Sequence, residues 1–168
     1  MYPFDLVFRP ITQMDENEQG EYKEAVMSGV QAETVATTLQ VTYDETQHCT
    51  VVRNPLGRTV GMDSCRATGG KGEEFSPGNL VGAGLAGCML FSMGVLALRD
   101  GLDISGASVD VEVSMTEKRI GSIALTIGMP RSFSPDERLK LERASGRCPI
   151  KSSFHPDIPI SVRFDYPA

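Results

Sequence analysis

The sequence has no stretch in which lysine and arginine gather into a basic stripe. Its 16 basic residues are outnumbered by 22 acidic ones, and the net charge is −6. A protein that binds nucleic acid needs a basic surface to neutralise phosphates. The composition therefore predicts no nucleic-acid partner.

Cysteine is scarce as well. The chain of 168 residues has four, at positions 49, 65, 88 and 148. Four are too few for a disulfide scaffold, and no C-x-x-C spacing occurs, so neither a metal site nor a bound cofactor is predicted. The cysteines are then either small buried hydrophobic residues, or one or two of them carry chemistry.

The N-terminal residues lack the basic region and apolar run of a secretory signal, and Asp5 precedes any apolar stretch. We therefore expect no secretory signal and a cytoplasmic location.

The length suits one domain with a sizeable core. We interpret residues 1–36 as a partly helical N-terminal extension, with a helix expected over 21–36, and residues 37–168 as the domain. In the domain, alternating apolar residues predict strands over 38–43, 48–53, 58–63, 109–113, 119–127 and 158–164.

Two helices are predicted between these strands, over 77–99 and 135–146. Each follows a Ser-Pro pair, which supplies a hydroxyl N-cap and a proline at the first helical position. Because the strands do not alternate strictly with helices, the order predicts an α+β fold.

Residues 80–98 form a run of 19 residues without a charge. A membrane span is one interpretation, but four glycines interrupt the run and no Lys/Arg bias flanks it. A second is a dinucleotide loop, because Gly82, Gly84 and Gly87 spell G-x-G-x-x-G. No buried strand precedes these glycines, as that motif requires. The third, which we favour, is a helix buried centrally in the fold or in a dimer, because it is apolar on all sides.

Two cysteine segments carry a resemblance to a known family. Ser76-Pro77 opens the small-residue helix that leads to Leu85-Ala86-Gly87-Cys88, and sixty residues later Cys148-Pro149 follows a second helix. With the strand at 119–127 between them, these segments resemble the OsmC/Ohr superfamily over residues 38–166.

This resemblance implies an intertwined homodimer of antiparallel sheets around a long buried central helix. It also implies a thiol-dependent reductase of organic hydroperoxides, in which Cys88 attacks and Cys148 resolves. A small or protein dithiol would then reduce the pair again. An apolar pocket would hold the peroxide, lined by Met89, Phe91, Met93 and Phe154.

The sequence departs from the family at one position that bears on the acidity of the thiol. Family peroxidases carry a glutamate directly after the helix-opening proline, and it pairs with an arginine that lowers the pKa of the cysteine. Here Gly78 occupies that position. We take Glu74 as the nearest substitute carboxylate and Arg66 as the first choice of cation. The alternatives for the cation are Arg53, Arg58 and Arg147.

A second function class stays open. The same pocket would hold an apolar small molecule without catalysis, and the cysteines would be incidental. Cys49 and Cys65 are expected to be structural, as are His48 and His155, although His155 follows the Cys-Pro segment and could line the pocket.

Overall fold

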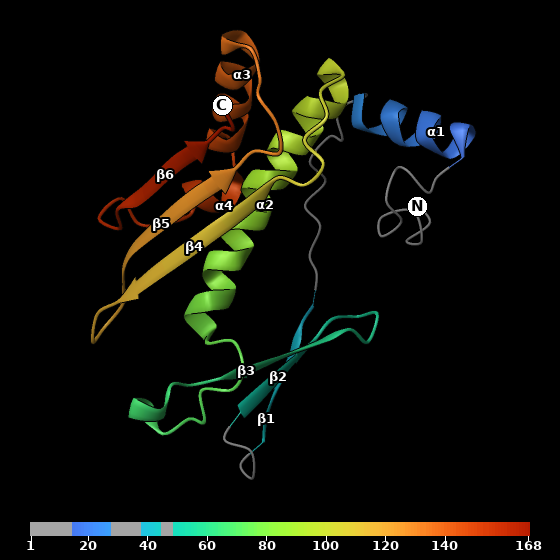
Figure 1. Cartoon of the computed structure of the whole chain (residues 1–168). Helices are drawn as coiled ribbons and strands as arrows, with labels where there is room; N and C mark the ends of the chain where they lie inside the picture. The colour runs from blue at the N-terminus through green and yellow to red at the C-terminus, as the bar shows by residue number, and fades with distance from the viewer. Residues whose placement is uncertain (1–14, 28–37, 45–48) are drawn as a thin grey trace.

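The computed structural model describes residues 15–27, 38–44 and 49–168 (Figure 1). Its elements in chain order are α1 (Glu16–Met27), β1 (Gln40–Asp44), β2 (Cys49–Arg53), β3 (Thr59–Asp63), a 3-10 helix (Arg66–Thr68), α2 (Pro77–Asp100), β4 (Ser108–Met115), β5 (Ile120–Gly128), α3 (Pro135–Gly146), α4 (Pro149–Ser152) and β6 (Ile160–Asp165). The predicted α+β class is confirmed. The helix expected over 21–36 begins earlier, at Glu16, and residues 28–36 lie outside the described residues.

The strands form two separate three-stranded sheets. The first is an antiparallel meander of β1, β2 and β3, and the second has the order β4-β5-β6. In the second sheet β4 pairs antiparallel with β5, whereas β6 pairs with β5 in parallel. A parallel pair needs a long crossover, which α3 and α4 provide. Pro159 directly precedes β6, an edge strand, so it costs the sheet no ladder hydrogen bond.

Helix α2 runs through the centre of the molecule and contacts β4, β5 and α3 (Figure 1). The Ser76 hydroxyl accepts a hydrogen bond from Asn79 N, and the Asn79 side chain accepts one from Ser76 N. This capping box fixes the first turn. At the other end Gly101 adopts φ 70°, a left-handed conformation that glycine enters without strain.

One face of α2 forms the core of the domain. Leu85, Met89 and Met93 have 0% exposure, and they pack against strand residues such as Ile123, Leu125 and Ile127. At Gly82 the helix approaches β4 so closely that an added Cβ would lie 2.6 Å from Val113 Cγ2. Glycine here therefore sets the distance between helix and sheet.

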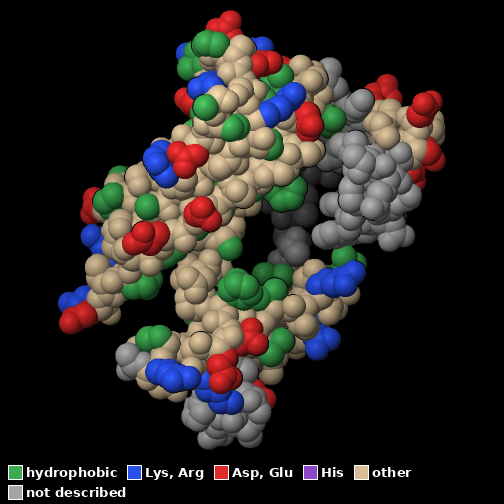
Figure 2. Space-filling model, in the orientation of Figure 1, with side chains coloured by type: hydrophobic (Ala, Val, Ile, Leu, Met, Phe, Trp, Pro, Cys, Tyr) green, Lys and Arg blue, Asp and Glu red, His purple; other side chains and the backbone are tan. Residues whose placement is uncertain are grey.

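The opposite face of α2 and the first sheet leave large apolar side chains uncovered. Phe91 is 76% exposed and Val95 51%, and every residue of β1 is exposed. In Figure 1 the first sheet lies beyond the N-terminal end of α2, away from the second sheet. In the space-filling view, hydrophobic side chains border the hollow between these two parts (Figure 2). The chain thus has an apolar surface that it does not cover itself.

Among the described residues, α2 is the one helix with the length and hydropathy of a membrane span, with a mean hydropathy of 2.0. A single helix of this kind is weak evidence for a span, because the core helix of a globular protein has the same properties. The face that carries Leu85, Met89 and Met93 is such a core face.

Candidate functional site

The two cysteines singled out by sequence lie on different elements of one hydrophobic cluster. Cys88 is partly buried in the middle of α2, and Cys148 is the N-cap residue of α4 with 0% exposure. Cys88 packs directly against the cluster to which Cys148 belongs. The Cys148 Sγ also lies 4.0 Å from the carbonyl oxygen of Leu85, which precedes Cys88 by three residues on the same face of the helix.

The two thiols influence each other. Burial raises the pKa of Cys148, and a side-chain hydrogen bond with Cys88 raises it further. The backbone N–H groups of Lys151 and Ile150 act in the opposite direction, but the raising effects prevail. Cys148 is therefore a neutral thiol near pH 7, and any chemistry that needs its anion must first remove a proton.

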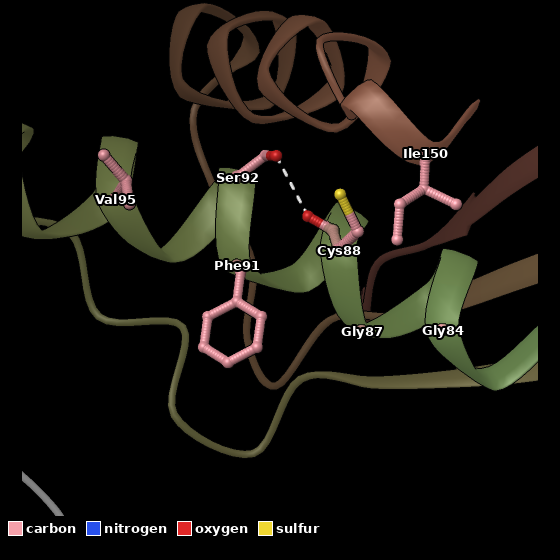
Figure 3. Close-up of a pocket in the computed structure, with 7 residues that line it drawn as sticks. All are labelled: Gly84, Gly87, Cys88, Phe91, Ser92, Val95 and Ile150. Atoms are coloured by element: carbon pink, nitrogen blue, oxygen red, sulfur yellow. Dashed lines mark hydrogen bonds between the residues drawn. The ribbon is translucent and has the colours of Figure 1, made fainter. Parts of the chain in front are cut away.

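Cys88 opens onto a cavity of about 480 Å³ on the outer face of α2 (Figure 3). It is lined by Gly84, Gly87, Cys88, Phe91, Ser92, Val95 and Ile150, and none of these side chains is charged. The Ser92 hydroxyl is the polar exception, and it donates to the Cys88 carbonyl oxygen at 2.9 Å. In Figure 3 the Cys88 sulfur points towards α4, where Ile150 forms the wall of the pocket. A hydrocarbon chain fits this lining better than a charged group does.

The pocket lining predicted from sequence was partly wrong. Phe91 does line the pocket, but Met89 and Met93 lie in the core with 0% exposure. Helical geometry explains the difference, because residues one and five positions after Cys88 turn away from its face. Phe154 packs against the core cluster beside Cys88 and does not line the pocket.

Several lining residues were missed for the same reason. Gly84, Ser92 and Val95 lie four residues before and four and seven residues after Cys88. This is the spacing of one helix face, so a helical projection centred on Cys88 would have found them. Ile150 is brought in by α4, and no local sequence signal places it there.

Arg66 and Glu74 lie on the loop between β3 and α2, and both are exposed. The Arg66 Nε donates to the Lys71 carbonyl oxygen at 3.0 Å, and the Glu74 carboxylate lies against Gly61 of β3, 3.0 Å from where a Cβ would be. Neither residue lines the pocket of Cys88 within the single chain. The fold thus places Cys88 and Cys148 in one cluster and Arg66 and Glu74 on one loop. Within the single chain, this loop does not line the Cys88 pocket.

This loop is organised around the buried carboxylate of Asp63. Burial alone raises the pKa of Asp63, but hydrogen bonds from the backbone N–H groups of Glu73, Ser64, Gly72 and Lys71 outweigh that effect and hold the pKa below its usual value. The loop also has little space, since a Cβ on Gly70 would collide with the Ser64 carbonyl group. The conformation of the loop that carries Arg66 and Glu74 is therefore stabilised by hydrogen bonds from its own backbone N–H groups to the Asp63 carboxylate.

The other residues considered from sequence lie elsewhere. Arg53 ends β2, Arg58 is exposed in the turn before β3, and Arg147 is the exposed C-cap of α3. Cys65 is exposed, with its Sγ 3.3 Å from the Thr68 hydroxyl, and exposed His155 accepts a hydrogen bond from Asp157 N. Cys49 begins β2, and His48 lies outside the described residues.

Gly78 packs against the end of β4. A Cβ at this position would lie 3.3 Å from the Met115 Sδ and 3.8 Å from Val113 Cγ1. A longer side chain at this position would have to displace Met115. The site is therefore built around a small residue where the resemblance implied a glutamate.

Comparison with known proteins places the chain by both sequence and structure. A sequence model of a protein family described as OsmC-like protein matches residues 70–163, which is more than half of the chain. No curated protein sequence matches. Among solved structures, a candidate osmotic stress induced and detoxification response protein from Psychrobacter arcticus is 27% identical, with a TM-score of 0.72 over 80% of this chain and 99% of that chain.

Two more distant structures share the fold. An organic hydroperoxide resistance protein OsmC from Legionella pneumophila is 19% identical, with a TM-score of 0.62 over 79% of this chain and 98% of that one. The organic hydroperoxide resistance protein OhrB of Bacillus subtilis is 14% identical, with a TM-score of 0.60 over 79% of this chain and all of that one.

Proposed function

Because this chain belongs to the OsmC-like protein family, we propose that it reduces organic hydroperoxides with Cys88 as the attacking thiolate and Cys148 as the resolving thiol. One observation carries the proposal. Two thiols from distant parts of the chain lie together in one hydrophobic cluster, where Cys88 helps to raise the pKa of Cys148, and Cys88 opens onto an uncharged apolar pocket.

The reaction consumes one peroxide and forms one disulfide. The Cys88 thiolate attacks one peroxide oxygen, the O–O bond breaks, and the alkoxide leaves and takes up a proton to give the alcohol. Cys88 is then a sulfenic acid. The Cys148 sulfur gives up its proton and attacks the Cys88 sulfur, which expels the hydroxyl as water and closes the disulfide. A small or protein dithiol then reduces that disulfide.

The pocket favours an organic peroxide over hydrogen peroxide. Phe91, Val95 and Ile150 offer apolar surface to a hydrocarbon chain, and each buried CH₂ contributes about 0.8 kcal/mol. Hydrogen peroxide has no such group. Two relatives with this fold are named for organic hydroperoxide resistance, which agrees with this substrate class.

We also propose an intertwined homodimer, formed by the domain of residues 37–168, with residues 1–36 as an extension. The exposed apolar residues of β1 and the outer face of α2 support it, because a surface of this kind is seldom left in water. Light scattering coupled to size-exclusion chromatography is expected to give twice the mass of the 18.2 kDa chain. A mass of one chain at all concentrations would contradict the dimer.

We propose Arg66 and Glu74 as the residues that tune Cys88 within the dimer, because inside one chain their loop does not reach the Cys88 pocket and a partner protomer would have to supply it. A cation near a cysteine favours the thiolate, and the exposed side chains on this loop are free of the core. An Arg66→Ala variant that reduces peroxide as fast as the unaltered protein would remove Arg66 from the mechanism. The proposed setting is a soluble cytoplasmic protein.

The direct test is titration of the reduced protein with an organic hydroperoxide such as cumene hydroperoxide, followed by thiol counting and peptide mass spectrometry. We expect one equivalent to consume two thiols per chain and to give a Cys88–Cys148 crosslink. Cys65→Ser serves as the control, because an exposed thiol outside the pocket contributes to neither result. Four unreacted thiols would favour the second candidate, a non-catalytic protein that binds an apolar small molecule in the same pocket.

A further inference from the structure

The two ends of the loop between β3 and α2 meet at one buried side chain. Asp63, the last residue of β3, is 5% exposed. Its carboxylate accepts hydrogen bonds from the backbone N–H groups of Ser64 at 2.6 Å, Lys71 at 3.0 Å and Glu73 at 3.2 Å. Hydrogen bonds from N–H groups to a carboxylate are charge-assisted and stronger than neutral ones. Asp63 therefore joins the first residue of the loop to residues near its end.

The Arg66 side chain binds a peptide group that Asp63 orients. Arg66 Nε donates to the Lys71 carbonyl oxygen at 3.0 Å. The same peptide group carries the Gly72 N–H, which donates to the Asp63 carboxylate and, at 3.1 Å, to the Ser64 carbonyl oxygen. A peptide group is planar, with its N–H and carbonyl pointing in opposite directions. Fixing the N–H therefore also fixes the oxygen that Arg66 binds.

Glu74 lies between two hydrogen bonds that both involve Asp63. The Glu73 N–H donates to the Asp63 carboxylate, and the Asp63 N–H donates to the Phe75 carbonyl oxygen at 2.9 Å. These contacts hold the backbone on either side of Glu74, whose carboxylate lies against Gly61 of β3. Both side chains proposed as tuning residues therefore depend on Asp63 for their position.

The sequence of the loop suits a conformation imposed by this carboxylate. Residues 66–72 contain three glycines, and Gly69 and Gly72 adopt φ 91° and 69°. Glycine loses more backbone freedom than any other residue when its conformation is fixed, so the loop needs strong contacts to stay in one arrangement. A Cβ on Gly70 would lie 2.6 Å from Asp63 Oδ1, so the third glycine makes room for the carboxylate.

From these contacts we propose that Asp63 is a positioning residue of the reaction, which holds Arg66 and Glu74 in the arrangement from which they act on Cys88. The proposal rests on the tuning role proposed above for these two residues, and on the dimer that brings their loop to the Cys88 pocket. In this role Asp63 makes no contact with the reacting atoms. Its removal affects Cys88 through the loop.

The direction of the effect separates positioning from a direct electrostatic influence. Arg66 favours the Cys88 thiolate, so a loop that no longer presents Arg66 leaves the thiol harder to ionise. A negative charge near a thiol acts in the opposite direction, and its removal makes the thiol easier to ionise. Loss of the Asp63 carboxylate therefore gives shifts of opposite sign under the two explanations.

The main test measures how the rate of Cys88 alkylation by iodoacetamide depends on pH in the reduced full-length protein, followed by peptide mass spectrometry. Arg66→Ala is expected to move the midpoint of this profile upward by about one pH unit. Asp63→Asn keeps the shape of the side chain and should give a similar upward shift. In the Arg66→Ala background Asp63→Asn should cause no further upward shift, because the cation that it positions is gone.

Asp103→Asn is the matched control. The Asp103 carboxylate also accepts a hydrogen bond from a backbone N–H, that of Ser105 at 2.9 Å, but its loop follows the opposite end of α2. This variant should leave the alkylation profile unchanged. Size-exclusion chromatography checks that each variant keeps the mass of the unaltered protein.

A second measurement follows the loop without reference to Cys88. Hydrogen–deuterium exchange of peptides that span residues 64–75 should be at least about tenfold faster in Asp63→Asn, because charge-assisted hydrogen bonds are lost, and unchanged in Asp103→Asn. Equal exchange in Asp63→Asn and the unaltered protein would show that the carboxylate does not hold the loop, and would overturn the proposal.

The alkylation profiles separate failure of this proposal from failure of the one beneath it. A shift with Arg66→Ala but none with Asp63→Asn would overturn the role of Asp63 and leave Arg66 in the mechanism. No shift with Arg66→Ala would refute the tuning proposal and this one together, without affecting the pairing of Cys88 with Cys148.

Two further results would also overturn the role of Asp63. A downward shift with Asp63→Asn would mean that its charge acts on the thiol directly. Equal upward shifts with and without Arg66 would mean that Asp63 acts independently of that residue. If Asp63→Asn does not fold, Asp63→Ser is measured in its place, with the same expected shift and the same outcomes.

Discussion

A Cys88→Ser variant is expected to lose at least about 1,000-fold in kcat/KM for organic hydroperoxide reduction, because a serine hydroxyl stays protonated near neutral pH and does not attack an O–O bond. The fold should survive, since the side chain is only partly buried and the two residues are close in size. Peroxide consumption followed with a dithiol in excess measures the loss, and circular dichroism confirms that the variant is folded.

The matched variants make this result specific. Cys65→Ser should retain full activity, whereas Cys148→Ser should consume one equivalent of peroxide and stop at a sulfenic acid on Cys88, which dimedone traps. If the Cys88→Ser variant still reduces peroxide, then a thiol other than Cys88 attacks the peroxide. A Cys148→Ser variant that turns over as fast as the unaltered protein with glutathione as reductant would show that the second thiol is not required.

Replacing Gly82 with valine is expected to lower the free energy of unfolding by about 3 kcal/mol, or to lower Tm by about 6–12 °C. A Cβ at this position would lie 2.6 Å from Val113 Cγ2 and 3.0 Å from Val111 Cγ1, both on branched side chains that cannot swing aside freely. The helix must then move away from β4. Thermal unfolding followed by circular dichroism measures the change.

Gly94, on the same helix, provides a comparison that separates a clash inside one protomer from a clash across the proposed dimer interface. Within this chain no atom lies within 4 Å of its Cβ position, so Gly94→Val creates no clash inside one protomer. Equal stability of Gly82→Val and the unaltered protein would contradict the close approach of α2 to β4. Equal destabilisation by both variants would instead mean that the outer face of α2 is also covered, as the proposed dimer requires.

Much of the fold followed from local sequence signals. The Ser-Pro pairs predicted the starts of α2 and α3, and both helices begin at the expected proline with a capping box. These signals are strong because a cap depends on residues within one turn. The alternation of apolar residues likewise located the strands of both sheets.

What the sequence did not reveal depends on contacts between distant segments. The parallel pairing of β5 with β6 and the position of Ile150 over Cys88 both arise from the path of the chain through α3 and α4. The burial of Met89 and Met93 depends on which side of α2 the second sheet occupies. Composition predicted an apolar helix but not which of its faces meets the core, because the residues are apolar all round.

The places of Arg66 and Glu74 were beyond sequence reasoning for a different reason. Their loop is shaped by backbone N–H groups that converge on the Asp63 carboxylate, and backbone geometry of this kind leaves little trace in residue type. Gly70 is the one visible sign, because only glycine fits against the Ser64 carbonyl group. The glycine pair at positions 69 and 70 predicted a loop without predicting where its charges would point.

The capping box at Ser76 also fixes the direction in which the Cys88 thiol points, because it fixes where helix α2 begins. Each residue of an α-helix advances the chain by about 100° around the axis and about 1.5 Å along it. Cys88 follows Ser76 by twelve positions. If any residue between them is deleted and the helix still begins at Ser76, the Cys88 sulfur turns away from Cys148. The length of this stretch is therefore as much a part of the redox centre as the two cysteines are.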